Sequence, residues 1–424
     1  MKDQYGRTID YIRISVTDRC NLRCVYCMPE EGVEQVAHEE ILTYQEIVRI
    51  AGLCARMGIS KVKLTGGEPL VRKGLYSLVR DLKRCEGIEQ VTLTTNGVEL
   101  KSQMEELAKA GLDAVNISLD TLDAGMYASV TRRDMLDQAL EGLKEALRYP
   151  QVKVKINCVP MRNVNEGQWT TLAGFSRDLP VDVRFIEMMP IGLGKEFQGR
   201  SQDDILAALR KAYGQETLFY GKCGNGPSIY VKFPGFKGRI GFISAISHKF
   251  CGECNRIRLT SEGFLKPCLQ YENGTDIKGP LRRGQSDEEL AMLIEDAIYN
   301  KTIHIIGGKQ KFSFLDIKDA ADAVCRLVQK ENMMWKREYN LGNNYQINIM
   351  DIAQEVNCCL ESLGLDSAEI ILSPSEIQLN SGMNCERIYR ELDWLPQYSF
   401  HSSVMDYVRY KIGEKKKDKE KSNA

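Results

Sequence analysis

Short β-branched runs alternate with amphipathic stretches over residues 11–189, and this alternation constrains the fold more than any other feature of the chain. The expected strands cover residues 11–15, 60–64, 90–94, 114–118, 152–159 and 181–187. The expected helices between them cover residues 43–57, 75–85, 101–110 and 135–146. Repeated strand–helix alternation is typical of a parallel sheet covered by helices. The sequence therefore predicts an α/β fold built on an incomplete parallel (β/α)6 barrel.

Polar turns follow three consecutive expected strands. They read Thr65-Gly66-Gly67-Glu68-Pro69, Thr94-Thr95-Asn96-Gly97 and Ser118-Leu119-Asp120. Gly-Gly and Asn-Gly are also common in ordinary turns, so one such turn alone indicates little. In parallel barrels, however, active sites gather at the carboxyl ends of the strands. Three polar turns in register therefore predict a site at that end of the barrel.

Three cysteines, Cys20, Cys24 and Cys27, follow the first expected strand with the spacing Cys-x3-Cys-x2-Cys and no nearby fourth cysteine. A 4Fe–4S cube normally takes four thiolates, so three leave one iron open to a small molecule. The alternatives are a zinc knuckle or three unrelated buried thiols. Zinc sites usually show paired Cys-x2-Cys units or histidines, and no histidine occurs here before His38. The spacing favours an iron–sulfur cluster.

A second triplet, Cys251, Cys254 and Cys268, has the spacing Cys-x2-Cys-x13-Cys and again offers three thiolates. Arg256 and Arg258 lie beside it. Guanidinium groups next to a metal site can hold phosphates through paired hydrogen bonds, which favours a second cluster with an open iron.

A closed zinc site with His248 as fourth ligand is the alternative for this triplet. The other eight of the fourteen cysteines are expected to be small buried hydrophobes. They are Cys54, Cys85, Cys158, Cys223, Cys325, Cys358, Cys359 and Cys385.

The length and the net charge of the chain limit the number of domains and the classes of binding partner that we expect. The chain has 424 residues, enough for two or three domains. Its net charge of −1 gives no electrostatic reason to expect nucleic-acid or membrane binding. No apolar run is long enough to span a bilayer, and the first residues lack a signal core. Many cysteines without a signal peptide are typical of metal ligation in the reducing cytosol, so we expect a cytoplasmic protein.

Two levels of resemblance follow from these motifs. The first cysteine triplet resembles that of radical S-adenosylmethionine enzymes. Over residues 11–304 the chain resembles, more specifically, the GTP 3',8-cyclase (MoaA) family of molybdenum cofactor biosynthesis. Besides the motifs above, the resemblance rests on Ser15-Val16-Thr17-Asp18-Arg19-Cys20, Ser118-Leu119-Asp120-Thr121-Leu122-Asp123, Arg184-Phe185-Ile186-Glu187-Met188-Met189-Pro190 and Cys251-Gly252-Glu253-Cys254-Asn255-Arg256-Ile257-Arg258.

The resemblance implies two 4Fe–4S clusters, S-adenosylmethionine on the first and GTP on the second. The implied S-adenosylmethionine contacts are Tyr26, Gly67, Ser118 and Met189. The implied GTP contacts are Arg13, Lys61, Lys63, Thr94, Lys155, Arg184, Arg256 and Arg258. Any one of these cations could otherwise be a solvated surface charge.

The reaction that the resemblance implies starts with a 5'-deoxyadenosyl radical that removes the ribose 3'-hydrogen of GTP. The carbon radical then attacks C8 of guanine and gives (8S)-3',8-cyclo-7,8-dihydroguanosine 5'-triphosphate. The implied partners are an external electron donor of flavodoxin or ferredoxin type, a downstream cyclic pyranopterin monophosphate synthase and a second copy of the chain in a homodimer.

Two departures from the family pattern stand out. Lys63 occupies a position where the family has arginine, and lysine keeps the charge but loses the planar fork. The family ends in a Gly-Gly that enters the active site. Here Gly307-Gly308 is followed by about 116 residues, so that role is not carried over to it.

The last quarter of the chain resembles the late part of extended short-chain dehydrogenases and nucleotide-sugar epimerases, but no Gly-rich dinucleotide fingerprint accompanies it. Amphipathic helices are expected at about 317–329 and 349–363. The expected domains are a partial barrel (1–220), a C-terminal iron–sulfur and substrate subdomain (221–306), a small α/β appendage (307–412) and a disordered charged tail (413–424). Alternatives to GTP cyclisation are radical chemistry on another nucleotide or nucleotide sugar, and a catalytically impaired fusion protein.

Overall fold

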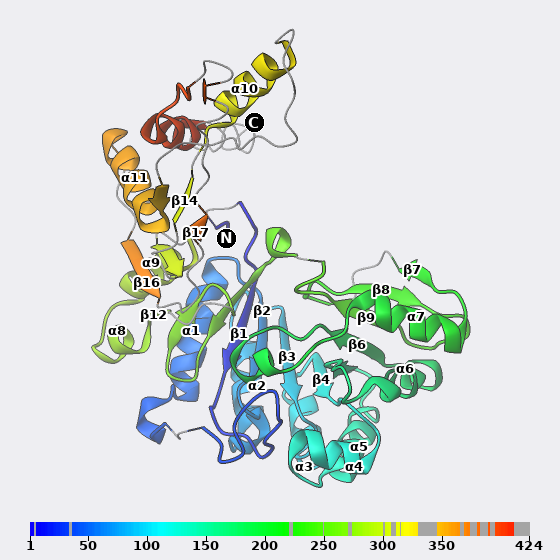
Figure 1. The fold of residues 1–424 in the computed structure, drawn as a ribbon. Coiled ribbons are helices and arrows are strands. Elements are labelled where there is room, and N and C mark those ends of the chain that lie inside the picture. The colour runs from blue at the N-terminus through cyan, green and yellow to red at the C-terminus, as the bar shows by residue number, and fades with distance from the viewer. Residues whose placement is uncertain are drawn as a thin grey trace. The chain divides into compact units, whose positions relative to one another are not determined.

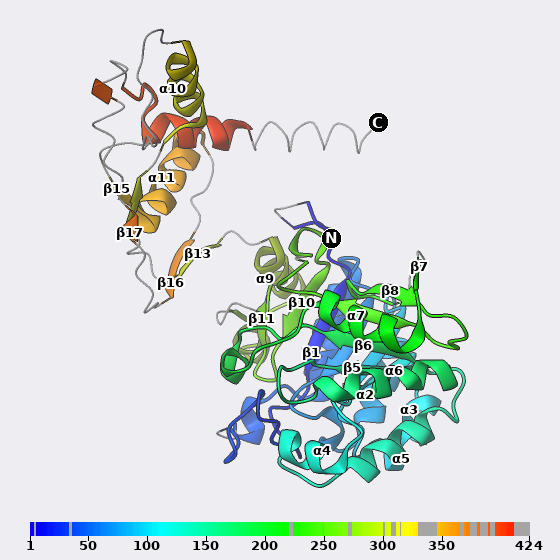
Figure 2. The same ribbon diagram turned by 45° about the vertical axis from the view of Figure 1, so that its right-hand side comes forward.

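The chain divides into two compact units, Met1–Asn300 and Lys301–Ala424, in this computed structural model (Figures 1 and 2). The structure describes residues 1–3, 6–33, 36–219, 224–248, 250–269, 274–299, 302–306, 311–313, 315–329, 346–364, 369–373, 380–381, 389–390 and 395–410. Gly307, Gly308 and the charged tail at 413–424 lie outside the described residues. The division at Asn300 falls a few residues before the expected boundary at 306.

One twelve-stranded sheet forms the centre of the first unit. Its strands are β1 (Tyr11–Ser15), β2 (Lys61–Thr65), β3 (Gln90–Thr95), β4 (Ala114–Ser118), β5 (Lys153–Cys158), β6 (Asp182–Ile186), β7 (Thr217–Phe219), β8 (Ile229–Lys232), β9 (Ile240–Ile243), β10 (Arg256–Leu259), β11 (Phe264–Lys266) and β12 (Thr275–Asp276). Their order is β12-β11-β10-β1-β2-β3-β4-β5-β6-β9-β8-β7. The six predicted strands are confirmed as β1 to β6, each to within one residue at either end.

The parallel part of the sheet extends beyond the six predicted strands. β10 pairs in parallel with β1, and β9 pairs in parallel with β6. Antiparallel strands then follow on both sides. Residues after 221, expected to form a subdomain of their own, thus lengthen both edges of the barrel sheet.

Helices connect the parallel strands, and several lie along one face of the sheet (Figures 1 and 2). They are α1 (Tyr44–Arg56), α2 (Leu75–Arg84), α3 (Leu100–Lys109), α4 (Ala124–Thr131), α5 (Leu136–Ala146), α6 (Trp169–Asp178), α7 (Gln202–Tyr213), α8 (Lys278–Arg282) and α9 (Asp287–Tyr299). The four predicted helices are confirmed as α1, α2, α3 and α5. A capping box fixes the start of α1, because Thr43 accepts from the Glu46 amide and Glu46 accepts from the Thr43 amide.

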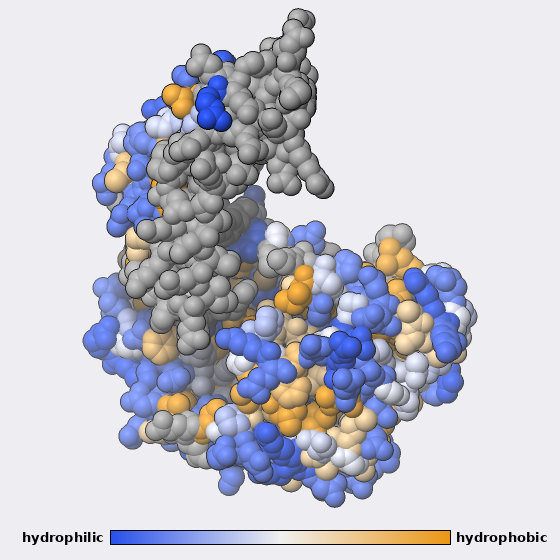
Figure 3. All heavy atoms as spheres, viewed as in Figure 1, coloured by the Kyte–Doolittle hydropathy of each residue, from blue (hydrophilic) through white to orange (hydrophobic). Residues whose placement is uncertain are grey.

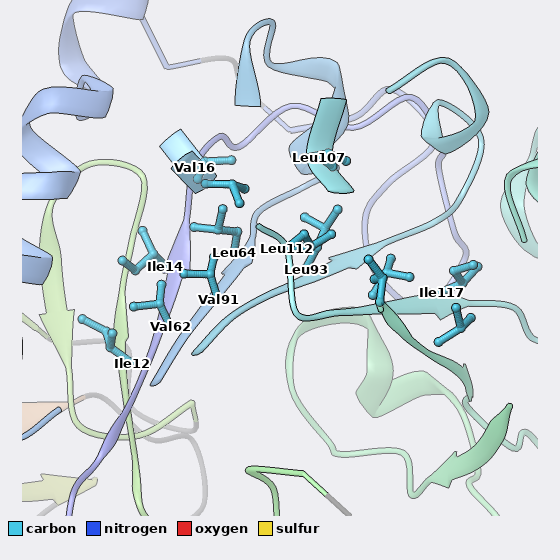
Figure 4. Packing of buried hydrophobic residues seen from close by; sticks show 14 of the residues in the cluster. Ile12, Ile14, Val16, Val62, Leu64, Val91, Leu93, Leu107, Leu112 and Ile117 are labelled. Carbon is cyan, nitrogen blue, oxygen red and sulfur yellow. The ribbon is translucent and has the colours of Figure 1, made fainter. Parts of the chain in front are cut away.

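Alternate strand residues face opposite sides of the sheet, which separates core from lumen. One set is aliphatic and fully buried, and Figure 4 shows part of it packed together. This set includes Ile12, Ile14, Val62, Leu64, Val91, Leu93, Val115 and Ile117. The other set is largely polar and faces the inside of the partial barrel.

Figure 3 shows one face of the first unit, with hydrophilic side chains over most of it and an apolar patch near the middle. No helix among the described residues combines the length and apolar character needed to cross a bilayer.

The second unit is smaller, and its described residues form two short sheets. β13 (Thr302–Ile306) pairs in parallel with β16 (Glu369–Ser373). β14 (Lys311–Ser313) lies between β15 (Gln346–Asn348) and β17 (Asn380–Ser381). The two predicted tail helices are confirmed as α10 (Ile317–Gln329) and α11 (Ile349–Ser362), and a further helix covers residues 400–410.

Candidate active site

A cavity of about 560 Å³ occupies the lumen of the partial barrel. Among the described residues that line it, seven are cationic and one, Asp182, is acidic. The cations are Arg13, Lys63, Lys153, Lys155, Arg184, Arg239 and Arg256. A lumen with this imbalance favours a polyanionic ligand.

Six of the eight residues predicted to contact nucleotide line this cavity. They are Arg13, Lys63, Thr94, Lys155, Arg184 and Arg256. Lys61 and Arg258 are not among its lining residues; Lys61 instead makes an ion pair with Asp10.

Crowded positive charge raises the free energy of this lumen when it holds no anion. Burial lowers the pKa of Lys63 well below its usual range, and Arg184 and Arg13 nearby lower it further. Burial likewise lowers the pKa of Arg13, whose buried Nε atom has no hydrogen-bond partner within the described structure. An anion bound beside these groups would relieve both penalties.

Asp182 at the start of β6 organises part of the positive charge. Its carboxylate accepts from Arg239 Nε at 2.9 Å and Nη2 at 3.1 Å, and it lies 3.5 Å from Lys155 Nζ. Lys155 Nζ also donates to Tyr230 Oη at 2.9 Å. These contacts fix the Lys155 ammonium and the Arg239 guanidinium at the lumen wall.

Two asparagines fix Arg184. Its guanidinium donates to Asn157 Oδ1 at 2.6 Å and to Asn116 Oδ1 at 2.7 Å, and Asn116 Nδ2 donates to the Leu93 carbonyl. Sequence reasoning missed Asn116, Asn157, Tyr230 and Arg239. A usable signal existed at the two asparagines, because both are polar residues at the inward positions of otherwise aliphatic strands.

Strand pairing brings the second arginine pair to the lumen edge. β10 places Arg256 beside Tyr11 and Arg258 beside Arg13. The Arg256 guanidinium carbon lies 5.3 Å from the ring centre of Phe250. Burial, Arg13 and Arg256 lower the pKa of Arg258 to about 9, so the side chain stays protonated near neutral pH.

The first cysteine triplet lies in the loop that follows β1, at the carboxyl end of the strand. Cys20 and Cys24 are half-buried and Cys27 is exposed. The loop is shaped by its own backbone, since the Cys27 amide donates to the Cys24 carbonyl at 2.9 Å and the Leu22 amide donates to Cys20 Sγ at 3.4 Å. Desolvation raises the pKa of all three thiols.

The described structure does not gather these three thiols as closely as a single zinc ion would require. Zinc–sulfur bonds of about 2.3 Å place the sulfurs of a tetrahedral site about 3.8 Å apart. Cys20, Cys24 and Cys27 form no group whose ligand atoms all lie within 4.8 Å of one another; among the described residues such a group occurs in the second unit alone. A cube, with iron atoms at separate corners, needs the wider spacing.

Unpaired polar atoms surround the same loop. The Asn21 Nδ2 atom and the Tyr127 hydroxyl are buried without hydrogen-bond partners in the described structure. Cys24 and Cys20 lie near Tyr127. Buried donors of this kind suit a bound group with acceptor atoms, such as the sulfides of a cluster or a carboxylate.

The Gly66-Gly67 turn after β2 packs directly on the cysteine loop. The Gly67 amide donates to the Thr17 carbonyl at 2.8 Å. A Cβ atom at Gly67 would meet the Arg19 carbonyl oxygen at 2.3 Å and that of Asp18 at 2.6 Å. Only glycine allows this approach.

A buried acid ties three loops together. Glu68 accepts from Thr95 Oγ1 at 2.6 Å and from the Asn96 amide at 2.6 Å. Asn96 Nδ2 in turn donates to Asn21 Oδ1 at 2.7 Å, inside the cysteine loop. Burial raises the pKa of Glu68 to about 7. Two of the three polar turns predicted to share one edge of the barrel are therefore in contact with each other, and one of them also contacts the cysteine loop.

The predicted S-adenosylmethionine residues lie on this edge. The Tyr26 hydroxyl donates to Asp120 at 2.7 Å, just after β4 and its last residue Ser118. Burial raises the pKa of Asp120 to about 6. A Cβ atom at Gly194 would lie 2.7 Å from the Met189 carbonyl oxygen and 3.9 Å from that of Tyr26, so the loop after β6 reaches the cysteine loop.

The second triplet is described in part. Cys254 and Cys268 are half-buried, and Cys268 lies near Arg258. The side chain of Cys251 lies outside the described part. His248 is exposed, and its Nδ1 atom contacts the Ser247 hydroxyl at 3.1 Å.

The other cysteines are buried less often than expected. Cys54, Cys158 and Cys359 are buried and Cys85 is half-buried, but Cys325 and Cys358 are exposed. The prediction of burial was wrong for Cys325 and Cys358. Both lie on helices, and residue type alone does not show which side of a helix faces solvent. Cys223 and Cys385 lie outside the described residues.

Family models match both parts of the first unit. The radical SAM superfamily model covers residues 14–175, and the molybdenum cofactor synthesis C model covers residues 181–305. The GTP 3',8-cyclase of Clostridium perfringens (strain 13 / Type A) is 46% identical over 303 residues, covering 71% of this chain and 93% of that protein. The chain belongs to the GTP 3',8-cyclase family.

Other relatives agree with this membership. The GTP 3',8-cyclase of Desulforamulus reducens is 43% identical over 304 residues, covering 71% of this chain and 94% of that protein. Among solved structures, Streptococcus suis SuiB shares the fold with a TM-score of 0.50 and 16% identity, covering 70% of this chain and 71% of that one. The partial-barrel radical SAM fold is thereby confirmed. The family models end at residue 305, so the epimerase resemblance of the tail stays a prediction.

Proposed function

We propose that this chain converts GTP to (8S)-3',8-cyclo-7,8-dihydroguanosine 5'-triphosphate in molybdenum cofactor biosynthesis. The single observation that carries the proposal is the cationic lumen of about 560 Å³ in a chain of this family. Ligand pockets usually measure roughly 300–1,000 Å³. GTP carries about four negative charges near neutral pH, which seven lining cations can offset.

The lumen side chains would bind and orient GTP. Arg184 is already held by two asparagines and Lys155 by Asp182 and Tyr230, so neither loses much freedom on binding. Arg13 offers a buried Nε donor that has no hydrogen-bond partner among the described residues. We also assign phosphate contacts to Lys63, Thr94 and Arg256. We assign a phosphate contact to Arg258 as well. Lys61 would make one only after leaving its ion pair with Asp10.

We assign the two cysteine triplets to two 4Fe–4S clusters, one at Cys20, Cys24 and Cys27 and the other at Cys251, Cys254 and Cys268. Bound at the first triplet, a cluster and S-adenosylmethionine supply one-electron reduction and a carbon radical. Tyr26, Gly67, Ser118 and Met189 would hold S-adenosylmethionine. Because the Gly67 amide donates to the Thr17 carbonyl, we assign the Gly67 carbonyl as the group that would accept from the ammonium group of S-adenosylmethionine.

Protein atoms would also keep the reacting carbon away from water. The lumen is closed outward by the aliphatic strand faces and the helices packed on them. Exclusion of water and of other hydrogen donors suits radical chemistry. We further propose a flavodoxin- or ferredoxin-type electron donor, a cyclic pyranopterin monophosphate synthase as the enzyme that takes the product, and assembly of the chain as a homodimer.

The test is an anaerobic assay of the reconstituted full chain with GTP, S-adenosylmethionine and dithionite. Liquid chromatography with mass spectrometry should detect 5'-deoxyadenosine and a cyclised nucleotide with the mass of GTP. Iron analysis should give close to eight iron atoms per chain, as two cubes require. Cleavage of S-adenosylmethionine without any GTP-derived product would contradict the proposal, and stimulation by a UDP-sugar in place of GTP would favour a nucleotide-sugar substrate.

A further inference from the structure

Three potential metal ligands meet in the second unit, away from both cysteine triplets in sequence. They are Glu355 and Cys359 on α11 and His401 on the helix at 400–410. One ligand atom from each residue lies within 4.8 Å of those of the other two. We propose that these three side chains form a zinc site.

The arrangement of the three donor atoms supports this assignment. Glu355 and Cys359 are four residues apart, which places them on the same side of α11. The Cys359 thiol points to Glu355 Oε1 at 3.9 Å, and His401 Nδ1 contacts the same oxygen. The thiol sulfur and the imidazole nitrogen thus converge on one carboxylate oxygen, and a divalent cation can bind between the three atoms.

The donor chemistry favours zinc. Thiolate, imidazole and carboxylate are the ligands that zinc takes in proteins, at about 2.0–2.3 Å. Zinc with one thiolate, one carboxylate and one neutral imidazole carries no net charge, which suits a partly buried site. Binding releases the Cys359 thiol proton to solvent, and a water molecule can complete the tetrahedron.

Burial and anchoring distinguish the group from a chance surface cluster. Cys359 is fully buried, Glu355 is 24% exposed and His401 is 59% exposed at the side chain, so the site opens on one side. A capping box of Asn348 and Asp351 fixes the start of α11.

The segment that carries His401 is anchored separately on α10. The buried Asp319 carboxylate accepts from the Gln397 and Tyr398 amides at 2.8 and 3.0 Å. Ser403 Oγ also donates to Asp316, just before α10. Both sides of the ligand set are therefore held before a metal arrives.

The test measures zinc on the cluster-loaded full chain after exposure to zinc sulfate and gel filtration. Elemental analysis should find about one zinc per chain in the wild type. The substitutions Cys359→Ser, His401→Ala and Glu355→Gln should each lower zinc at least fivefold with iron unchanged. Cys358→Ser is the matched control, because its exposed thiol is next in sequence but outside the ligand group, and it should keep its zinc.

Zinc-edge X-ray absorption locates the metal independently of activity. One sulfur at about 2.3 Å with nitrogen and oxygen neighbours would support the site. Two or more sulfurs would place the zinc at a cysteine triplet and overturn the proposal. So would equal zinc in all variants, or no zinc in the wild type. If Cys359→Ser does not fold, His401→Ala, at an exposed position, decides the outcome.

Discussion

At the scale of single residues, one acid sets the charge balance of the lumen. Asp182 is 6% exposed and holds both Arg239 and Lys155. Removing one partner of a buried ion pair leaves the others uncompensated, which is far more damaging than losing a surface pair. Asp182 is therefore a positioning residue that keeps two cations at fixed places on the wall.

Replacing Asp182 by asparagine should destabilise the protein by about 2–4 kcal/mol, because two cations then share a low-dielectric wall without their anion. Urea denaturation followed by circular dichroism measures this loss. Asp178→Asn is the control: Asp178 also binds an arginine through two contacts, but it is exposed. If the two variants had equal free energies of unfolding, the buried Asp182 contacts would stabilise the protein no more than the exposed Asp178 contacts do.

Lys63 provides a second test at this scale. Lys63→Met should weaken GTP binding about tenfold or more, since one charge-assisted contact is worth roughly 1.5–3 kcal/mol. Lys63→Arg should restore binding by returning the planar fork. Equilibrium dialysis under anaerobic conditions gives both constants. Lys61→Met, on the same strand but paired with Asp10, should have the smaller effect. If Lys61→Met weakened GTP binding more than Lys63→Met, Lys61 rather than Lys63 would be the lysine that contacts the nucleotide.

At the scale of secondary-structure elements, close packing between turns builds the cysteine site. Gly67→Ala should lower the iron content of the reconstituted protein, because the new Cβ would collide with backbone oxygens of Arg19 and Asp18 that cannot rotate away. Iron analysis and the visible absorption of the cluster measure it.

The control for this glycine is Gly52→Ala. Gly52 lies inside α1, and a Cβ there meets nothing within 4 Å. That variant should load iron normally and gain about 0.5–1 kcal/mol of stability from better helix propensity. Normal cluster loading in Gly67→Ala would contradict the proposed role of the Gly66-Gly67 turn.

Glu68, which ties the polar turns together, should make stability depend on pH. Its pKa is raised from 4.5 to about 7, so the folded chain holds a proton that the unfolded chain loses between these values. The contribution is therefore fully present below pH 4.5 and is lost as the pH rises to about 7, by up to about 3 kcal/mol.

Urea denaturation of iron-free, reduced protein at pH 5 and pH 7.5 checks this. Glu68→Gln should show a flatter pH dependence than the wild type, whereas Glu106→Gln, at an exposed position on α3, should keep the wild-type slope. Parallel pH profiles of the wild type and Glu68→Gln would exclude a titrating Glu68.

Strands were easier to predict from the sequence than the site inside them. The positions of β1 to β6 could be predicted because aliphatic residues alternate along them, as Ile12 and Ile14 do in β1, and such side chains must be buried. α4 was missed, because Gly125, Ser129 and Thr131 are weak helix formers and its apolar side is short. β9 and β10 are four residues each, too short for a pattern to show that they extend the parallel sheet.

The motif residues of the site were found, but their supports were not. Arg184 is part of a recognisable motif, whereas Asn157 and Tyr230 matter only because strand register and closure of the barrel bring them to Arg184 and Lys155. Such long-range contacts leave no local signal in one sequence. Only the polar inward positions of the strands hinted at them.

At the scale of the whole molecule, the family resemblance and the first compact unit nearly coincide. The family models end at residue 305, and the unit ends at Asn300. The helix α9 closes this unit, since Leu290, Ile294 and Ile298 are buried in its core and Asp287 pairs with Arg49. The core of the first unit is thus complete before the second unit begins.

A chain ending at residue 306 should therefore fold and load iron like the full-length protein, with a melting temperature within about 3 °C by circular dichroism. A chain ending at residue 284 lacks α9 and exposes the pocket left by three buried aliphatic side chains. Because each such loss costs about 2–5 kcal/mol, this shorter chain should be unfolded or insoluble. If the chain ending at 306 melts far below the full-length protein, the second unit contributes to the stability of the barrel and the two units are not independent.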